Sequence, residues 1–430
     1  MRRRDFLRHA VAASGAIALP RRRWIQGVAR GTDSLLVPMD DAQQDHLKAY
    51  GLAFRSLGRG DRSEWWLNYR SGSFLVPASD AVTHDAALAG VTLEPIDAGA
   101  ITDIRGQILA GNMESVPLEK LPKIAVYAPP DAAPWDDAVT MVLNYAGVEF
   151  KRVWDPEVMA GDLAKFDWLH LHHEDFTGQY SKFALTSAGA PWLQAMMQLQ
   201  QTTAARLGFA NGPDLKRAVA QNLEQFVTRG GFLFAMCTAT ETLDLALASQ
   251  GVDIAAAYAD GTPMDPLASS KMHWDKALAF HDAQLELSPS LAVFSDIDGH
   301  QVNTSNKQPL GAFTLFNFAA KIDPVATMLV QNHRQVIPDF YGVTTSFRRT
   351  RIKPEVVILA DEPGAPWAKY LHGEHGRGTW TFFGGHDPED PEHAIGNAPT
   401  DLSLHPHSPG YRLILNNVLF PAAKKKELKT

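Results

Sequence analysis

The segment TRGGFLFAMCTATETLD, from Thr228 to Asp244, contains the clearest fold signal in the chain. Two glycines open an apolar run, Phe232 to Met236, which is typical of a buried strand. The next residues, Thr238 to Glu241, match a capping box, the pattern that begins a helix. The segment therefore predicts a strand that passes directly into a helix, which is the basic unit of an α/β fold.

Cys237, the only cysteine in 430 residues, falls on the turn between this strand and this helix. Such a turn lifts its central residue above the sheet, where the positive end of the helix stabilises a thiolate. It also requires small residues two places to either side, and Ala235 and Ala239 meet this requirement. Cys237 is thus a candidate nucleophile. The same sequence also suits a free cysteine that packs as a small apolar residue.

Short apolar runs followed by amphipathic segments recur from Leu35 onward, and this alternation predicts the α/β class. We expect a flavodoxin-like or Rossmann-like, mostly parallel sheet with helices on both faces. Strands are predicted at Leu35–Val37, Trp65–Leu67, Lys123–Tyr127, Trp168–His172, Gly231–Met236, Val356–Leu359 and Gly378–Phe383. Helices are predicted at Gln43–Leu57, Asp136–Gly147, Ala218–Thr228, Thr240–Ser249 and Tyr411–Leu419.

Two segments resemble each other without gaps: DDAQQDHLKAYGLAF from Asp40 and DDAVTMVLNYAGVEF from Asp136. A true repeat would give the protein two related Rossmann-like halves, whereas generic helix-start and glycine-stop signals would produce the same likeness. The polar stretch from Gly111 to Lys123 has two prolines and is predicted to be a linker. We therefore expect an amino-terminal α/β segment at 34–115 and a domain at 120–430, with an insertion at about 252–317.

The first residues, MRRRDFLRHAVAASGAIALP, resemble a twin-arginine export signal, which we assign to residues 1–33. The run from Ala10 to Leu19 is too short to span a bilayer as a permanent helix. A basic amphipathic tail is the alternative. The signal predicts a periplasmic or secreted protein whose mature chain has no integral membrane segment.

The composition is that of an ordinary folded protein, with 45% hydrophobic and 20% charged residues. The formal net charge is −8, and acidic and basic residues are mixed along the chain. No broad basic face is therefore expected, which argues against a nucleic-acid partner. The expected partner is a small-molecule substrate, either an amide or a carbohydrate.

A second chemical signal is GTWTFFGGHDPED, from Gly378 to Asp390. A predicted strand ends at two glycines, and His386 then emerges at its carboxyl end, the place where ligands gather in open α/β sheets. His386 is a candidate base for Cys237, with Asp387 or Glu389 orienting its ring. The alternative is a loop in which these residues cap the next segment.

A third signal is WLHLHHEDFTGQY, from Trp168 to Tyr180, whose strand-like alternation delivers four polar residues to the same edge of the sheet. His172, His173 and Asp175 are predicted ligands for a divalent metal. A more distant histidine would have to complete the site, and the candidates are His386, His405 and His407. The alternative is a hydrogen-bonded polar loop that lines the cleft.

Further residues are predicted to face the same cleft and to bind substrate. One group belongs to the acidic loop that follows the Lys123–Tyr127 strand, although helix capping explains its two aspartates equally well. The predicted substrate-binding residues are Thr238, Trp135, Asp136, Asp137 and Glu174.

The pairing of GGFLFAMCTA with the later GGHDPE resembles the class I glutamine amidotransferase-like superfamily, whose motifs are G-x-C-x-G and H-P-E. The run YLHGEHGRGTWTFFGGHDPEDPEHAIGN is similar to its ThuA-like branch. Leu35 to Lys426 also resembles exported bacterial proteins that often bear the label asparagine synthetase B, most specifically in VPMDD, HLKAYG and LHLHHEDFTGQY. The chain departs from the superfamily pattern because alanines replace the elbow glycines and Asp387 is an extra residue after His386.

The superfamily resemblance implies a cysteine-dependent amide hydrolase, with Cys237 as the nucleophile, His386 as the base and the Thr238 N–H stabilising the oxyanion. ThuA-like relatives generally lack the catalytic cysteine, so that branch implies a carbohydrate-related or metal-binding protein. No S-G-G-x-D-S loop is present, and we therefore do not expect true asparagine synthetase activity. The aromatic residues proposed to stack on sugars are Trp65, Trp66, Trp135, Trp168 and Tyr180.

Overall fold

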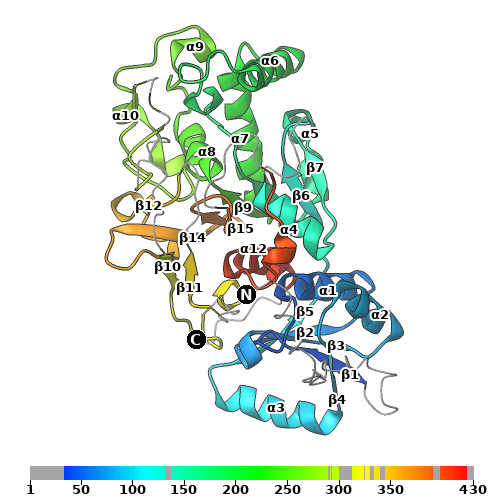
Figure 1. The fold of residues 1–430 in the computed structure, drawn as a ribbon. Coiled ribbons are helices and arrows are strands. Elements are labelled where there is room, and N and C mark those ends of the chain that lie inside the picture. The colour runs from blue at the N-terminus through cyan, green and yellow to red at the C-terminus, as the bar shows by residue number, and fades with distance from the viewer. Residues whose placement is uncertain are drawn as a thin grey trace, which may run out of the picture.

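The computed structural model describes residues 33–130, 137–288, 291, 293–299, 312–323, 325–329, 334–338, 344–390 and 398–423. Two β-sheets with their covering helices make up the molecule (Figure 1). The α/β class is confirmed. Apart from residue 33, the predicted export signal lies outside the described residues.

The amino-terminal sheet has five strands in the order β4-β1-β3-β2-β5, and every pair is antiparallel. Alternate side chains point to opposite faces: Trp65 packs with the core that contains helix α1, and Trp66 packs with helix α3. The strands are β1 (Ser34–Val37), β2 (Ser63–Leu67), β3 (Ser73–Pro77), β4 (Glu94–Ile96) and β5 (Glu114–Leu118). The helices are α1 (His46–Gly58), α2 (Asp80–Ala89) and α3 (Ala98–Ala110).

The prediction of two related halves is wrong, because the first sheet is antiparallel whereas the second has a parallel region. The aligned glycines also differ in structure. Gly51 lies inside α1, whereas Gly147 adopts φ +70 and ends α4 (Ala138–Ala146). The likeness therefore came from generic helix signals.

The second sheet has the order β11-β10-β13-β14-β15-β9-β8-β6-β7, with β12 paired to β14. Strands β15, β9, β8, β6 and β7 are mutually parallel, and the pairs from β15 outward to β11 are antiparallel. The strands are β6 (Ile124–Tyr127), β7 (Lys151–Val153), β8 (Trp168–Leu171), β9 (Phe232–Met236), β10 (Ala312–Leu315), β11 (Val336–Pro338), β12 (Phe347–Arg348), β13 (Val357–Asp361), β14 (Trp367–His375) and β15 (Gly378–Phe383).

Helices cover both faces of this sheet, as predicted. Alternate residues of β9 separate the two cores: Phe234 packs on the side of α4 and α12, and Leu233 packs on the side of α7 and α8. Helix α6 packs against α7. The remaining helices are α5 (Asp155–Met159), α6 (Pro191–Arg206), α7 (Gly212–Thr228), α8 (Thr238–Ala248), α9 (Ala257–Asp260), α10 (Ala268–Lys271), α11 (Ala326–Leu329) and α12 (Pro409–Leu419).

The two sheets share one hydrophobic core, because α1 packs against α4 and α12. Strand β5 occupies part of the predicted linker, since Val116 and Leu118 are buried in this core and the strand pairs with β2. The passage between the sheets is therefore limited to residues 119–123. Most of the predicted insertion at 252–317 is irregular where it is described, with the short helices α9 and α10 and strand β10 at its end.

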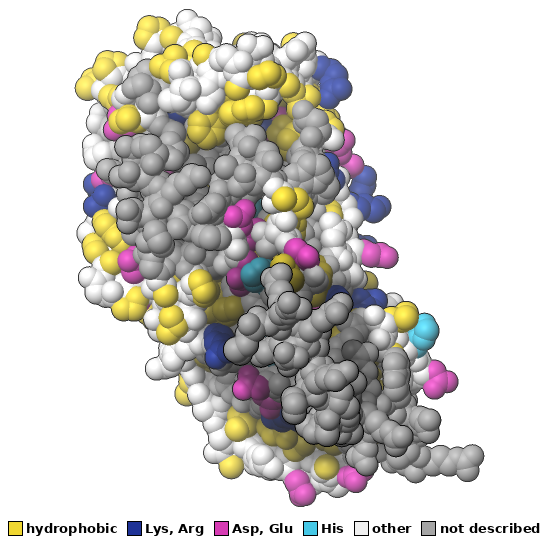
Figure 2. Space-filling model, viewed as in Figure 1, with side chains coloured by type: hydrophobic (Ala, Val, Ile, Leu, Met, Phe, Trp, Pro, Cys, Tyr) yellow, Lys and Arg dark blue, Asp and Glu magenta, His cyan; other side chains and the backbone are white. Residues whose placement is uncertain are grey.

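The surface agrees with the mixed charge of the sequence. On the face shown in Figure 2, Lys and Arg side chains are dispersed among acidic ones and form no single patch. Among the described residues, no helix combines the length and apolar character needed to cross a membrane.

Candidate functional site

Cys237 lies on a tight turn between β9 and α8, as the sequence predicts. Its backbone adopts φ +52 and ψ −141, a region that residues with a side chain rarely occupy. The Cys237 N–H donates to the Gly385 carbonyl at 3.1 Å, which joins the end of β9 to the turn after β15. The turn thus has the strained backbone of a nucleophile elbow.

The sulfur of Cys237 is buried, with 2% of the residue exposed. In the described part of the chain, its hydrogen-bond contact is with the Thr238 hydroxyl at 3.7 Å. The side chain packs in the core on the α4 and α12 side of the sheet. The predicted pairing of this sulfur with the His386 ring is therefore not among its contacts.

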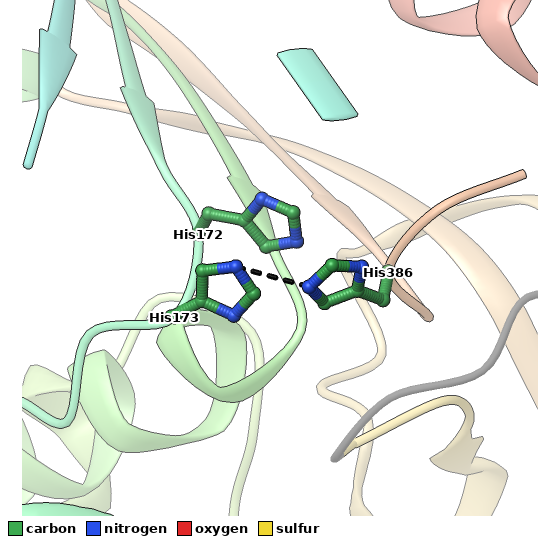
Figure 3. Close-up of side chains that lie close together, drawn as sticks. All are labelled: His172, His173 and His386. Carbon is green, nitrogen blue, oxygen red and sulfur yellow. Dashed lines mark hydrogen bonds between the residues drawn. The ribbon is translucent and has the colours of Figure 1, made fainter. Parts of the chain in front are cut away.

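Three histidines converge at the carboxyl ends of β8 and β15, on either side of β9 (Figure 3). His172 and His173 follow the last residue of β8, and His386 follows the two glycines after β15. The rings of His172 and His173 stack with centroids 3.9 Å apart, and the His386 centroid lies 4.4 Å and 4.3 Å from them. One nitrogen of each ring lies within 4.8 Å of the others, so the three could hold a metal ion.

The electrostatics favour a neutral ring for His172. Burial, aided by the neighbouring His173, lowers the pKa of His172 to about 3. Its Nε2 is buried and has no hydrogen-bond partner among the described residues. The Nε2 atoms of His173 and His386 lie 3.0 Å apart. Three imidazoles are a common ligand set of catalytic zinc sites, which leave a further position open.

Asp137 supports this cluster from the start of α4. Its Oδ1 accepts the Thr140 N–H at 2.8 Å, which caps the helix, and lies 3.5 Å from His172 Nδ1. Its Oδ2 accepts from His170 Nε2 at 3.1 Å, while His170 Nδ1 donates to the Phe234 carbonyl. Burial alone would raise the pKa of Asp137, but the two imidazoles outweigh it and hold the pKa well below its usual value. The carboxylate thus lies beside His172 Nδ1, which forms no hydrogen bond with the described residues.

A cavity of about 310 Å³ opens beside these histidines, and His172, His173 and Glu174 form part of its wall. Lys216 Nζ donates to Tyr127 Oη at 2.9 Å and to Asp155 at 3.1 Å, and lies 3.5 Å from Glu174. Burial raises the pKa of Glu174 to about 7, although Lys216 opposes the shift. Because Lys216 is already paired with Asp155, its positive charge offsets the burial of the Glu174 carboxylate only in part.

Other predicted ligands lie elsewhere or have other partners. Asp175 is buried, but its oxygens accept the N–H groups of Thr177, Gln179 and Ser181, so it stabilises its own loop. His405 pairs with Glu389 at 3.1 Å. Of the three distant histidines suggested by the sequence, only His386 joins the cluster.

None of the described hydrogen bonds joins the His386 ring to Asp387 or Glu389, the two acids predicted to orient it. Asp387 accepts from the Tyr411 hydroxyl at 2.7 Å and from the Thr400 hydroxyl at 2.9 Å, which fixes the loop to α12. His407 Nδ1 lies 3.1 Å from His46 Nδ1. Trp135 and Asp136 fall outside the described residues.

Three of the aromatic residues proposed to stack on sugars are core residues. Trp65, Trp66 and Trp168 are each 0% exposed. Tyr180 is also buried, although it forms part of the cavity wall. Trp65, Trp66 and Trp168 therefore offer no face to a carbohydrate.

Sequence reasoning missed His170, Lys216 and the helix α6 that covers the cavity. The alternation WLHLHH did place His170 on the strand, but it gave no indication of a carboxylate partner 33 residues earlier. Lys216 resembles an ordinary helix lysine in sequence, and only the packing of α7 buries it beside Asp155.

No protein-family model and no curated protein matches this sequence. Among solved structures, a cytoplasmic protein of Salmonella typhimurium is 11% identical with a TM-score of 0.34, and one from strain LT2 is 12% identical with a TM-score of 0.33. Each alignment covers 70% of this chain and 100% of the other. The GH42 β-galactosidase Gan42B is 9% identical, with a TM-score of 0.26 and coverage of 61% and 27%. Likenesses this weak carry no argument about function.

Proposed function

We propose that this protein is a hydrolase that uses a divalent metal ion held by His172, His173 and His386. The observation that carries the proposal is the convergence of three imidazoles, two buried and one half-buried, with ligand nitrogens within 4.8 Å of one another, beside a cavity. Imidazole donors suit zinc and neighbouring transition metals. Asp137 supplies the carboxylate that commonly orients a metal-binding histidine.

The proposed reaction is hydrolysis of an amide or ester. The bound ion would polarise the carbonyl and make water more acidic. The water oxygen forms a bond to the carbonyl carbon, the C–N or C–O bond breaks, and a water proton passes to the leaving nitrogen or oxygen. Glu174 lies in the same cavity and is the candidate carrier of that proton.

The test is metal binding by the full chain. Elemental analysis after equilibrium dialysis should find one zinc per chain, and cobalt substitution should give the absorption of a tetrahedral site. His172→Ala, His173→Ala and His386→Ala should each lose the ion, whereas the exposed His84→Ala should retain it. Equal metal content in all four variants would contradict the proposal.

A second candidate is the predicted cysteine-dependent amide hydrolase, and the strained backbone of Cys237 favours it. In this mechanism the sulfur attacks the carbonyl carbon while His386 accepts the thiol proton, and the C–N or C–O bond breaks as His386 passes that proton to the leaving nitrogen or oxygen. Water then hydrolyses the thioester and restores the thiol. His386→Ala should impair both mechanisms. Cys237→Ala distinguishes them, because metal-dependent turnover should survive this change and cysteine-dependent turnover should not.

The relationship to the amidotransferase-like superfamily and the export of the protein also remain proposals, supported by the sequence motifs alone. Replacing Arg3 and Arg4 by lysine should abolish twin-arginine export. Cell fractionation tests this directly, since retention of the variant but not of the wild type inside the cell is the expected result.

A further inference from the structure

Helix α6 has one buried face and one face that lines a cavity. Leu193, Gln200 and Ala204 are buried, and the helix packs against α7. Trp192, Met196 and Leu199 are spaced at i, i+4 and i+7, which places them on one face of the helix. All three are half-buried and line the 310 Å³ cavity. Hydrophobic side chains also gather on the surface over α6 (Figures 1 and 2).

Two apolar residues line another part of the cavity wall. Pro129 and Trp154 line it, and Lys216 Nζ lies 3.9 Å from the centroid of the Trp154 ring. The Tyr127 ring packs at 4.8 Å from the same tryptophan. These contacts hold Trp154 in place, so a ligand between it and α6 meets a preformed surface.

A strained turn completes the wall. Tyr180, Ser181 and Lys182 have consecutive positive φ values of 56, 53 and 56. Such residues persist only where the surroundings fix them. Here the buried Asp175 accepts the Ser181 N–H at 2.8 Å, and Lys182 Nζ donates to two carbonyls at 2.7 Å. Tyr180 and Ser181 consequently face the cavity.

The charges in the cavity do not favour an anion. The buried cation, Lys216, is paired with Asp155, and the carboxylate of Glu174 lies in the wall. Arg152 lines the cavity from an exposed position on strand β7. A negatively charged group inserted between α6 and Trp154 would thus be desolvated without a buried positive partner.

We propose that this cavity binds an uncharged amide or ester through an apolar acyl group, which lies between α6 and Trp154. The inference rests on the proposed function, since it places the carbonyl beside the three histidines. Trp192, Met196 and Leu199 are then the residues that select for the length of the acyl group.

The test is calorimetric binding of three anilides to the full chain: hexananilide, acetanilide and succinanilic acid, which carries a carboxylate. Hexananilide should bind at least about tenfold more tightly than acetanilide, because each buried methylene adds to affinity. Met196→Ala and Leu199→Ala should each weaken hexananilide binding by about tenfold and leave acetanilide within about twofold. The control is Gln198→Ala, an exposed position on the same helix, which should change neither.

The result that overturns the inference is succinanilic acid binding as tightly as hexananilide, or equal effects of the Met196 and Gln198 variants. The metal content of each variant, measured in parallel, separates the two proposals. Chain-length selectivity without a bound metal would contradict the hydrolase and leave the apolar subsite intact. A bound metal without chain-length selectivity would support the hydrolase and contradict the apolar subsite.

Discussion

Asp137 is the single residue that joins helix capping to the histidine cluster, because one carboxylate serves Thr140, His170 and His172. We predict that Asp137→Asn lowers metal affinity by about 10- to 100-fold, the usual effect of losing such an orienting carboxylate. Asparagine is also a good N-cap, so the helix should be retained. Competition with a zinc-binding dye measures the affinity.

The matched control is Asp97→Asn. Asp97 caps α3 by accepting the Ala100 N–H at 2.8 Å, the same distance as the cap in α4, and it lies far from the histidines in the amino-terminal sheet unit. This variant should keep full metal affinity. If both variants bind zinc as tightly as the wild type, Asp137 is only a helix cap.

The backbone of Cys237 gives a second prediction at this scale. At φ +52 and ψ −141 an alanine keeps the strain, whereas glycine adopts the conformation freely. Cys237→Gly should therefore be more stable than Cys237→Ala by about 1 kcal/mol, after the larger entropy loss of glycine on folding is subtracted from the relieved strain. Urea unfolding of the two variants measures the difference. The reverse order would show that the turn is not strained.

The site was partly predictable from sequence at the level of residues. The elbow signal around Cys237 and the strand ends before His172 and His386 were local patterns, and the strands that they predicted are present. The hydrogen-bond partners of these side chains could not be predicted from such local patterns. Asp175 and Asp387 looked available in sequence, but backbone N–H groups and the hydroxyl of Tyr411 occupy them in the fold.

At the scale of elements, the crossing of α1 and α4 depends on one glycine. A Cβ added to Gly51 would lie 1.7 Å from the Ala146 carbonyl oxygen, a contact that backbone atoms cannot relieve without moving. We predict that Gly51→Ala destabilises the protein by about 3 kcal/mol or more, as overpacking of a core does. Thermal and chemical unfolding provide the measurement.

Gly106, inside α3, is the control, because a Cβ there would meet nothing within 4 Å. Gly106→Ala should stabilise the protein by about 0.5–1 kcal/mol, since alanine is the better helix former. A similar effect of both substitutions would mean that the two helices do not approach as closely as described.

The elements that the sequence predicted share strong local signals, such as the apolar runs of β9 and β15. The predicted capping box at Thr238–Glu241 is wrong, because Cys237 is the N-cap of α8, without a side-chain cap hydrogen bond, and the Glu241 carboxylate accepts from Ser295 and Thr344. The antiparallel pairing of the first sheet had no comparable signal, because strand direction depends on distant partners: β1 pairs with β3 and β4, neither of which was predicted. Helix α6 was also missed, since its apolar residues face two different surroundings and give no single stripe.

At the scale of the whole molecule, acidic groups are buried on α8, where segments that include residues 278–280, Ser295 and Thr344 pack against this helix. Glu241 is 1% exposed and accepts from Ser295 Oγ at 2.5 Å and Thr344 Oγ1 at 3.0 Å. Burial and the charge of Asp298 raise its pKa to about 8, against the hydroxyl donors and Lys182. Asp244, on the same helix, accepts three N–H groups from residues 278–280, and burial raises its pKa to about 6.

These shifts predict that the protein loses stability between pH 6.5 and 8.5. In the unfolded chain Glu241 ionises near pH 4.3, so over this interval the folded chain binds more protons and the free energy of unfolding falls as pH rises. Asp244 adds little here, because its pKa lies below the interval. Glu174, whose pKa burial raises to about 7, adds to the fall, and His172 opposes it weakly because its ring in the unfolded chain still loses protons just above pH 6.5. The total fall should be about 2–3 kcal/mol, given about 1.4 kcal/mol for each pH unit and each such group. Glu241→Gln keeps one acceptor oxygen for the two hydroxyls, and its amide N–H can donate to the other, so this variant should reduce the slope of the profile. The exposed Glu355→Gln should leave the profile unchanged. Urea unfolding at successive pH values tests this, and a wild-type stability that rises through the interval would show that Glu241 is ionised in the folded protein.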